Sequence, residues 1–150
     1  MDTVSQEQRH YNMSRIRGKD TKPEILVRKY LFSQGLRYRK NYKKLPGHPD
    51  LVFPKYKTVV FINGCFWHGH DCGKFRLPKT NVEFWQNKIE TNKSRDQRII
   101  EKLESDGWRV IIIWECSINT VPARNETLPM IYNQLIGLGN NNMRINLRRL

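Results

Sequence analysis

Apolar residues recur with two different periods along this chain, and the alternation between the periods predicts the order of helices and strands. A first helix is predicted after Thr21, which forms a T-x-x-E capping box with Glu24 and has Pro23 in its first turn. Gly35 offers a C-terminal stop for this helix. Its apolar positions follow helical spacing: Ile25, Leu26, Tyr30 and Leu31.

The next segment has the alternation and the β-branched residues that are typical of strands. Leu36–Arg39 is a weak candidate strand, Asp50–Phe53 is a short one that Pro54 ends, and Thr58–Ile62 is strong. The loop Lys44–Pro49 contains two prolines and a glycine, so it makes a tight turn toward Asp50.

A second capping box at Thr80 and Glu83 predicts a long helix that runs to about Ser105 and ends at Gly107. Trp108–Glu115 then reads WRVIIIWE, which is apolar enough for a strand in the centre of a sheet.

A last helix is expected near Glu126–Ile136. The resulting order, α-β-β-β-α-β-α, predicts an α/β domain with a mixed central sheet. We expect this domain to span residues 20–137. A flexible basic arm over residues 1–19 precedes it, and a basic tail over residues 138–150 follows it.

Charge narrows the range of partners. The chain has 27 Lys and Arg against 14 Asp and Glu, a formal net charge of +13 that is spread from Arg9 to Arg149. This excess indicates a polyanion, and nucleic acid is favoured over a membrane because no long basic amphipathic helix is present. The alternative is a solvated basic surface without a partner.

The cysteines and the apolar runs indicate the cellular compartment of the protein. Its three cysteines are an odd number without a secretory signal, which favours reduced thiols or a metal site over a disulfide framework. No stretch approaches the roughly 20 apolar residues of a membrane span. We therefore expect a soluble, cytoplasmic protein.

Candidate zinc ligands cluster on one short loop. Thiolate and imidazole suit Zn²⁺, and a structural site needs four ligands. Cys116 is the natural fourth ligand because it follows the strong strand. His68 and Asp71 compete as ligands, and the cysteines could instead be small buried apolar residues. The other three candidates lie within eight residues: Cys65, His70 and Cys72.

A separate set of residues suits phosphodiester hydrolysis. Asp50 stands at the start of a short strand, where a carboxylate can hold Mg²⁺ with carbonyl, phosphate and water oxygens. His68 can take a proton from water near neutral pH. Glu24 can act through the water shell of the metal, or serve only as a capping partner.

Apolar aromatic residues flank the polar metal loop. Such side chains can form a wedge that unstacks a base step, which is easiest at a mismatch. Core packing is the alternative role, above all for Trp85, which lies at helical spacing from Ile89. The candidate wedge residues are Phe66, Trp67 and Trp85.

Several strings of residues, taken in order, resemble one known family. They are MSRIRGKDTKPE, LPGHPDLVF, VVFINGCFWHGHDC, EFWQNKI, RD and GWRVIIIWEC, which together span about Met13–Cys116. The chain resembles the very short patch repair (Vsr) DNA mismatch endonucleases. The resemblance implies a restriction-endonuclease-like PD-(D/E)xK fold with a mixed central sheet, helices on both faces and a structural zinc site. It also implies nicking 5′ to the thymine of a T·G mismatch that arises from 5-methylcytosine deamination.

The resemblance also implies roles for single residues. Asp50 and the carbonyl of Ile62 would bind Mg²⁺, His68 would be the general base, and Glu24 would assist. Asn63 stands where some members carry histidine, and an amide cannot carry a titrating proton. Ile62-Asn63-Gly64 also lacks the Glu-x-Lys of the fold, so His68 must do more. The zinc ligands would be Cys65, His70, Cys72 and Cys116, and the intercalating wedge would be Phe66, Trp67 and Trp85.

The partners expected from this reading are double-stranded DNA with a T·G mismatch, a DNA cytosine-5 methyltransferase and mismatch-repair proteins, with the enzyme itself a monomer. Sequence reading is expected from Arg15, Arg17, Lys19 and loop basic residues. Two alternatives stay open: a catalytically silent, zinc-stabilised DNA-binding module, and a restriction-type enzyme that cuts both strands of a fixed site.

Overall fold

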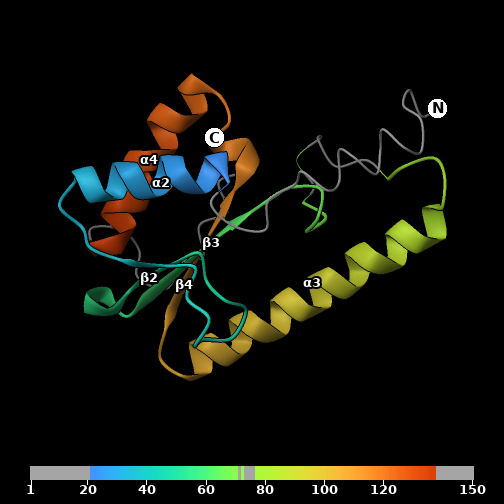
Figure 1. The fold of residues 1–150 in the computed structure, drawn as a ribbon, viewed down its shortest axis with the longest axis horizontal. Coiled ribbons are helices and arrows are strands. Elements are labelled where there is room, and N and C mark those ends of the chain that lie inside the picture. The colour runs from blue at the N-terminus through green and yellow to red at the C-terminus, as the bar shows by residue number, and fades with distance from the viewer. Residues whose placement is uncertain (1–20, 71, 73–76, 138–150) are drawn as a thin grey trace.

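The computed structural model describes residues 21–70, 72 and 77–137 (Figure 1). The predicted arm and tail, together with Asp71, Arg15, Arg17 and Lys19, lie outside this part of the chain. The described helices and strands occur in the predicted order. They are α2 (Lys22–Ser33), β1 (Arg39–Lys40), β2 (Leu51–Phe53), β3 (Thr58–Asn63), α3 (Val82–Ser105), β4 (Arg109–Trp114) and α4 (Val121–Leu135), with short 3-10 turns at Pro54–Tyr56 and Glu115–Ser117.

The four described strands form one mixed sheet in the order β1-β2-β3-β4. The pairs β1–β2 and β2–β3 are antiparallel, whereas β3 and β4 run parallel, with Asn63 opposite Trp114 at their carboxyl ends. The long helix α3 makes the crossover that a parallel pair requires. The predicted α/β domain with a mixed sheet is therefore confirmed.

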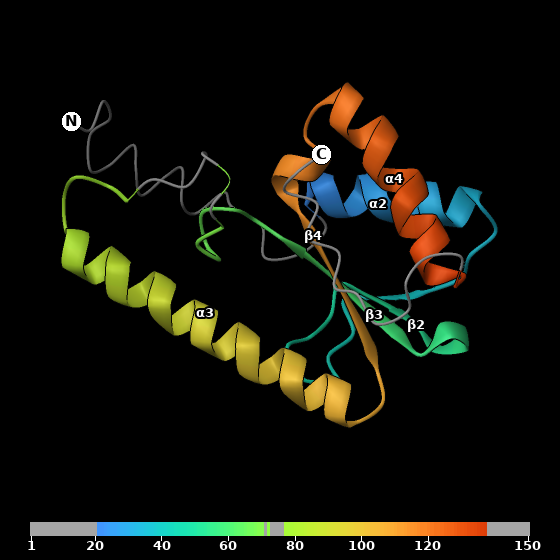
Figure 2. The same ribbon diagram turned by 180° about the vertical axis from the view of Figure 1, so that it is seen from behind.

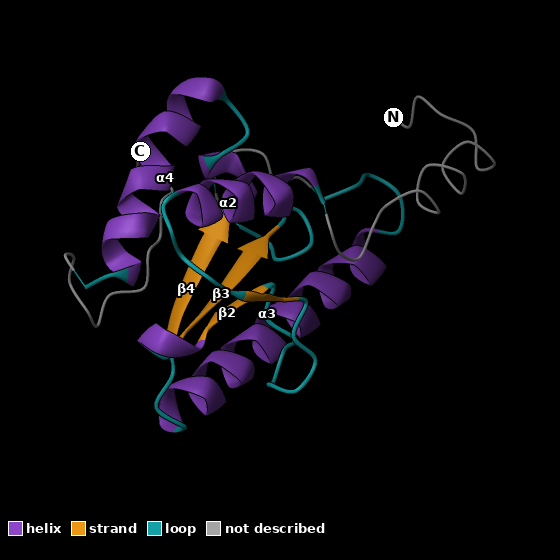
Figure 3. Ribbon diagram, turned by 60° about the vertical axis from the view of Figure 1, so that its left-hand side comes forward, coloured by secondary structure: helices purple, strands orange, loops and turns teal. Residues whose placement is uncertain are grey.

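Helices cover both faces of the sheet, as predicted: α2 and α4 lie on one face and α3 lies on the other (Figures 1 and 2). Alternation along the strands supplies both cores, because successive side chains point to opposite faces. On β3, Val60 packs in the core beneath α2 and α4, whereas Val59 packs with Ile100 and Leu103 of α3. Figure 3 shows the sheet between these layers.

The predicted stop of α2 at Gly35 is confirmed, whereas the strand predicted directly after it is shorter than expected. Gly35, at φ +91°, closes the helix with a pair of hydrogen bonds, one from its own N–H to Phe32 and one from the Leu36 N–H to Leu31. Leu36 is thus buried against the end of the helix, and the predicted strand over 36–39 begins only at Arg39.

Neither predicted capping box forms as expected. The Thr21 side chain makes no cap hydrogen bond, although the helix does begin after it. The cap of α3 is Asn81 rather than Thr80, and it has a left-handed backbone and no side-chain cap bond. The C-terminus of α3 agrees with the prediction: the helix ends at Ser105, and Gly107 follows as its stop.

Two further predictions are wrong in detail. In the described sheet β4 lies at the end of the strand order rather than in the centre. Its apolar character arises because helices cover both its faces: Ile111 and Ile113 face α2 and α4, and Val110 faces α3. The last helix begins at Val121, well before Glu126, because the Thr120 hydroxyl caps it by accepting from the Ala123 N–H.

No helix in the described part of the chain combines the length and apolar character needed to cross a membrane.

Candidate active site and metal centre

The candidate site lies where β3 and β4 end. Parallel strands place their carboxyl ends at one edge of the sheet, and loops and helices meet there. A pocket of about 720 Å³ opens at this edge. Acidic and basic side chains line it together with apolar ones, among them Glu24, Asp50, Asn63, Trp67, His68, Arg95, Asp96 and Glu115.

Asp50 stands just before β2, opposite the end of β3, and its Oδ2 accepts a hydrogen bond of 2.7 Å from the Ile62 N–H. Burial raises its pKa from 3.8 to about 7, the Ile62 bond opposes this rise, Glu24 adds to it and His68 reduces it. Asp50 is thus a buried carboxylate beside a second carboxylate, a pair that favours a bound cation.

His68 lines the same pocket and pairs with Asp96 on α3, a residue that the sequence analysis did not single out. The His68 Nδ1 lies 2.5 Å from the Asp96 Oδ2, and both side chains are about a quarter exposed. Because a carboxylate accepts hydrogen bonds, Nδ1 is the donor. The lone pair of a neutral imidazole is then on Nε2, where it can take a proton.

The other predicted catalytic residues also line the pocket. Glu24 comes from α2 and is only 5% exposed, so its side chain belongs to the pocket rather than to the solvated start of the helix. Asn63 is buried at the end of β3. Ile62 lines the pocket as well, and its N–H serves Asp50. The structure brings all five predicted residues to one place.

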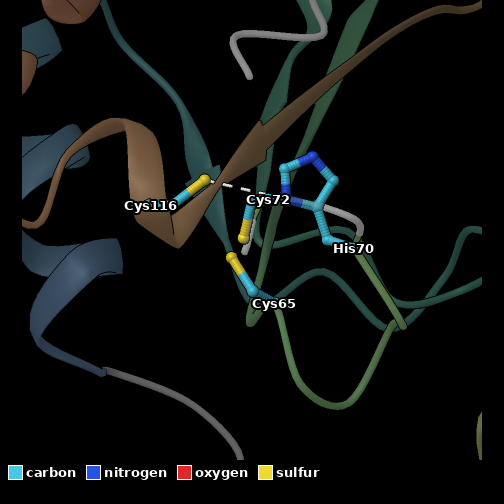
Figure 4. Close-up of side chains that lie close together, drawn as sticks. All are labelled: Cys65, His70, Cys72 and Cys116. Atoms are coloured by element: carbon cyan, nitrogen blue, oxygen red, sulfur yellow. Dashed lines mark hydrogen bonds between the residues drawn. The ribbon is translucent and has the colours of Figure 1, made fainter. Parts of the chain in front are cut away.

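The four predicted zinc ligands form a second cluster beside the pocket. The Sγ atoms of Cys65, Cys72 and Cys116 and a ring nitrogen of His70 all lie within 4.8 Å of one another (Figure 4). Cys65 and Cys116 meet because each follows one strand of the parallel pair by two residues. His68, a competing candidate, lies with Asp96 instead.

The donor atoms of this cluster fit a tetrahedral ion. Zinc–sulfur bonds of about 2.3 Å imply ligand separations of about 3.8 Å, and the Cys116 Sγ lies 3.7 Å from the His70 Nδ1. The His70 ring stacks on Trp114, with centroids 4.0 Å apart and planes 5° apart. Burial raises the pKa of the Cys65 thiol to about 12 and raises that of Cys116. A metal cation is what would make these thiols ionise.

The three predicted wedge residues form a cluster with one another. Ring centroids lie 5.2 Å apart for Phe66 and Trp67, 5.6 Å for Phe66 and Trp85, and 5.9 Å for Trp67 and Trp85. Phe84, which is 59% exposed, extends the cluster at 5.2 Å from Trp85. Since Trp85 is only half-buried, it does not belong to either buried core. An apolar patch thus adjoins the pocket, which Trp67 also lines.

One face of α3 holds the loop after β3, which carries Phe66, Trp67, His68 and three of the four predicted zinc ligands. Gly69, at φ +61°, lies against Ile89 and Lys93, so closely that a Cβ would come within 2.6 Å of the Ile89 Cγ2. One turn further along, the buried Asn92 side chain donates to the Trp67 carbonyl at 2.8 Å, and Asp96 holds His68 after another turn.

The sequence contains a signal for these missed residues. Apolar positions of α3 recur at 89, 99, 100 and 103, and positions 92 and 96 continue the same stripe with polar side chains. A polar residue on a buried stripe needs a partner. The partners of Asn92 and Asp96 are Trp67 and His68 on the loop after β3. The spacing of residues along α3 does not reveal that this loop packs there, because that is a property of the tertiary structure.

Comparison with known proteins finds one matching family and several similar enzymes whose names describe cleavage of DNA. Residues 1–74 match the family described as DNA mismatch endonuclease Vsr. The chain is 47% identical over 134 residues to type II nicking enzyme V.NmeAIP of Neisseria meningitidis, covering 89% of this chain and 96% of that protein. It is 47% identical over 122 residues to type II nicking enzyme V.XorIIP of Xanthomonas oryzae, covering 81% and 90%. It is 46% identical over 110 residues to DNA mismatch endonuclease Vsr of Escherichia coli, covering 73% and 70%.

Proposed function

Because this chain belongs to the Vsr family of DNA mismatch endonucleases, we propose that it is a Mg²⁺-dependent hydrolase that nicks one DNA strand 5′ to the thymine of a T·G mismatch. The mismatch would arise by deamination of 5-methylcytosine, and the nick would start very short patch repair. One observation carries the proposal. A pocket with a buried carboxylate and an oriented histidine opens beside a cluster of aromatic side chains.

The fold proposed for this activity is the restriction-endonuclease-like PD-(D/E)xK fold. Its support is the mixed sheet with Pro49-Asp50 at the start of an antiparallel pair. Asp50 meets the end of the partner strand through the Ile62 N–H, which is where such a fold needs its acidic residue. The Glu-x-Lys pair is absent at Ile62-Asn63-Gly64, so a different group must handle the proton.

The pocket suits a divalent cation. Burial raises the pKa of Asp50 and the neighbouring Glu24 adds to the rise, so the charged form of Asp50 gains from a bound cation. Asp50 and the carbonyl of Ile62 would hold Mg²⁺, with Glu24 acting through its water shell. Bound there, the ion would supply charge stabilisation for the phosphoryl group and acidify water.

His68 is the proposed general base. Its Nδ1 is engaged by Asp96, so Nε2 is the atom that takes the proton from the attacking water. Asp96 fixes the tautomer and the ring orientation, and its negative charge stabilises the imidazolium that forms. Asn63, which is buried and lines the same pocket, can orient a phosphate oxygen or a water but cannot share the proton.

The aromatic cluster is the proposed mismatch reader. Phe66, Trp67 and Trp85 would enter the base stack, which costs a few kcal/mol and least at a mispair. Zn²⁺ bound by Cys65, His70, Cys72 and Cys116 would be structural, since it leaves no open coordination position and would stiffen the loop that aims His68 and the wedge.

The proposed partners follow from this activity. The substrate is a duplex that carries a T·G mispair, and the activity is linked to a DNA cytosine-5 methyltransferase, whose product creates such mispairs on deamination. Mismatch-repair proteins would act in the same process. The enzyme is proposed to work as a monomer in the cytoplasm.

Cleavage of labelled duplexes tests the proposal. T·G-mismatched and matched duplexes are incubated with the protein in Mg²⁺ or in EDTA, and each strand is followed on a denaturing gel. We expect Mg²⁺-dependent nicking of the thymine strand alone, and none with Asp50→Ala, which should still bind. Binding without cleavage of either duplex would identify a silent DNA-binding module, and cutting of both strands of the matched duplex would identify a restriction-type enzyme.

The zinc proposal has its own test. Elemental analysis of the purified protein should find about one zinc per chain, and Cys72→Ala should lower both the zinc content and the melting temperature. Full zinc occupancy in Cys72→Ala would contradict the proposed ligand set.

A further inference from the structure

Asn92 lies in the middle of the buried stripe of α3, where an apolar side chain would be the ordinary choice. It is only 7% exposed. Burial of an amide is costly unless the amide is hydrogen-bonded, so its partners explain why it is tolerated. Those partners lie on two different functional elements.

The amide of Asn92 makes one hydrogen bond from each end. Its Nδ2 donates to the backbone carbonyl of Trp67 at 2.8 Å, and its Oδ1 accepts from the Arg95 Nη2 at 3.1 Å. The first bond fixes the backbone between Phe66 and His68, and the second fixes a guanidinium group one turn along α3. One buried side chain therefore joins the aromatic loop to Arg95.

Arg95 has a distinct place in the pocket. It is the only lysine or arginine among the described residues that line the pocket, and it shares that lining with the carboxyl groups of Glu24, Asp50, Asp96 and Glu115. A phosphate that approaches these acids meets repulsion, which a guanidinium group offsets through charge-assisted, bidentate hydrogen bonds. Because Arg95 is exposed, its guanidinium can reach such a ligand.

Trp67 belongs both to the aromatic cluster and to the lining of the pocket. It packs with Phe66 and Trp85 in the aromatic cluster, and it also lines the pocket. A displacement of its backbone would therefore move the aromatic side chains and the adjacent His68 together. A misplacement of about 1 Å can lower a rate on the order of 100-fold, so the position of this carbonyl matters for chemistry as well as for binding.

We propose that Asn92 is a positioning residue that couples two events: entry of Trp67 into the base stack, and capture of the neighbouring backbone phosphate by Arg95. The hydrogen bonds of Asn92 hold both groups in one fixed relation, so that a base step opened by the wedge presents its phosphate to the pocket. This inference rests on the proposed endonuclease activity, and it assigns that activity a phosphate-binding arginine and a buried amide that aligns it.

Single-turnover nicking of a T·G duplex in Mg²⁺ tests the first part. Asn92→Ala should slow nicking by about 10- to 100-fold while zinc content and melting cooperativity stay as in the unmodified protein. Asn92→Asp keeps the shape and an acceptor for Arg95 but places an oxygen against the Trp67 carbonyl, so it should be slowed as well. Asn87→Ala, an exposed asparagine on the same helix, is the matched control and should nick normally. A rate within twofold of the control for both Asn92 variants would overturn the proposal.

A base-stacking probe separates the two ends of the amide. With 2-aminopurine beside the mispair, fluorescence should rise on binding to the unmodified protein and to Arg95→Ala, because the wedge still enters. The rise should be reduced for Asn92→Asp and absent for Trp67→Ala. An equal, full rise for Asn92→Asp would show that the Trp67 bond does not position the wedge.

A double-mutant cycle keeps the proposal testable even if the Asn92 variants do not fold. Trp67→Ala and Arg95→Ala should each slow nicking, and the double variant should be slowed about tenfold less than the product of the two effects. Independent effects within twofold of that product would overturn the coupling. If the unmodified protein nicks neither duplex, the proposed function fails; if it nicks and the effects are independent, only this inference fails.

Discussion

Asp50 and Asp96 carry the same functional group, and their surroundings give them different roles. Asp50 is buried beside Glu24, and its pKa rises to about 7, so it is costly to ionise without a cation. Asp96 is about a quarter exposed and faces His68, from whose Nδ1–H its carboxylate accepts a hydrogen bond. At the scale of single residues, then, the first suits a metal ligand and the second an orienting partner.

The Asp96 assignment predicts a loss of rate without a loss of binding. Asp96→Asn keeps the size of the side chain but removes the charge that stabilises a protonated His68, so the nicking rate should fall by about 10²- to 10⁴-fold. Single-turnover kinetics measure the rate, and a binding titration with Ca²⁺ in place of Mg²⁺ measures affinity. Asp106→Asn, an exposed aspartate at the end of α3, is the control. A loss of affinity as large as the loss of rate would contradict an orienting role.

The raised pKa of Asp50 predicts a pH-dependent stability in the absence of metal. The folded state holds this proton up to about pH 7, whereas the unfolded chain releases it near pH 3.8, so the contribution of Asp50 to stability falls as pH rises between these values. In EDTA, Asp50→Asn should therefore gain melting temperature over the unmodified protein as pH rises from 4 to 8.

Addition of Mg²⁺ at pH 8 should raise the melting temperature of the unmodified protein and leave that of Asp50→Asn unchanged. Thermal melts followed by circular dichroism measure both effects. The same response of the two proteins to Mg²⁺ would place the ion elsewhere.

At the scale of elements, two arrangements build the site. The parallel pair β3–β4 brings Cys65 and Cys116 together at one edge of the sheet. The buried stripe of α3 then packs against the loop that follows β3. Gly69 marks a close approach of the backbone, because a Cβ at this position would come within 2.6 Å of the Ile89 Cγ2. The zinc cluster and the candidate catalytic pair are therefore held by the same helix.

This packing predicts that Gly69→Ala is more harmful than a similar change elsewhere. Gly69 and Gly35 both have positive φ, so alanine is strained by about 1–2 kcal/mol at either position. Only at Gly69 does the Cβ also meet Ile89, which adds about 1–3 kcal/mol of overpacking. Urea unfolding of the two variants should show this difference, and Gly69→Ala alone should nick slowly. Equal destabilisation of the Gly69→Ala and Gly35→Ala variants would mean that the loop moves away from Ile89 at no cost in free energy.

At the scale of the whole molecule, the sheet separates two helical layers that have different structural roles. The layer of α2 and α4 provides the larger buried core and, through Glu24, one wall of the pocket. On the opposite face lies α3, whose exposed side carries basic and acidic residues in nearly equal number, so the helix by itself is close to neutral. The net charge of +13 therefore belongs to the chain as a whole, and it fits a long anionic ligand better than a small one.

The charge of the chain predicts how DNA binding depends on salt. With a net charge of +13, most of the affinity should come from phosphate contacts, so binding of a matched duplex should weaken by about 10³-fold or more between 50 and 200 mM salt. Trp67→Ala should lower the affinity for the mismatched duplex and leave the salt slope unchanged, because its ring carries no charge. Fluorescence anisotropy titrations measure both. A slope near zero would show that the basic side chains of the protein do not contact DNA phosphates.

Much of the site was predictable because its chemistry is encoded by residue type. Cysteine, histidine and aromatic side chains are uncommon, and six of them lie within Cys65–Cys72, a feature that is visible in the sequence alone. Asp50 was predictable from its place at the start of a short strand. Asp96, Asn92 and Arg95 were not predictable in the same way. Asp, Asn and Arg are ordinary on a charged helix. The roles of Asp96 and Asn92 arise from contacts with a loop more than twenty residues away, and that of Arg95 from its bond to Asn92 and its place in the pocket.

The sequence by itself determined the order of the elements and the alternation that gives the sheet two apolar faces, because side-chain periodicity is a local property. It did not determine the N-terminal helix caps or the place of β4 at the end of the described sheet, because such features depend on what the rest of the chain places nearby. Only the tertiary structure decided which acids share a pocket, which acid holds His68, and that a buried amide links the aromatic loop to Arg95.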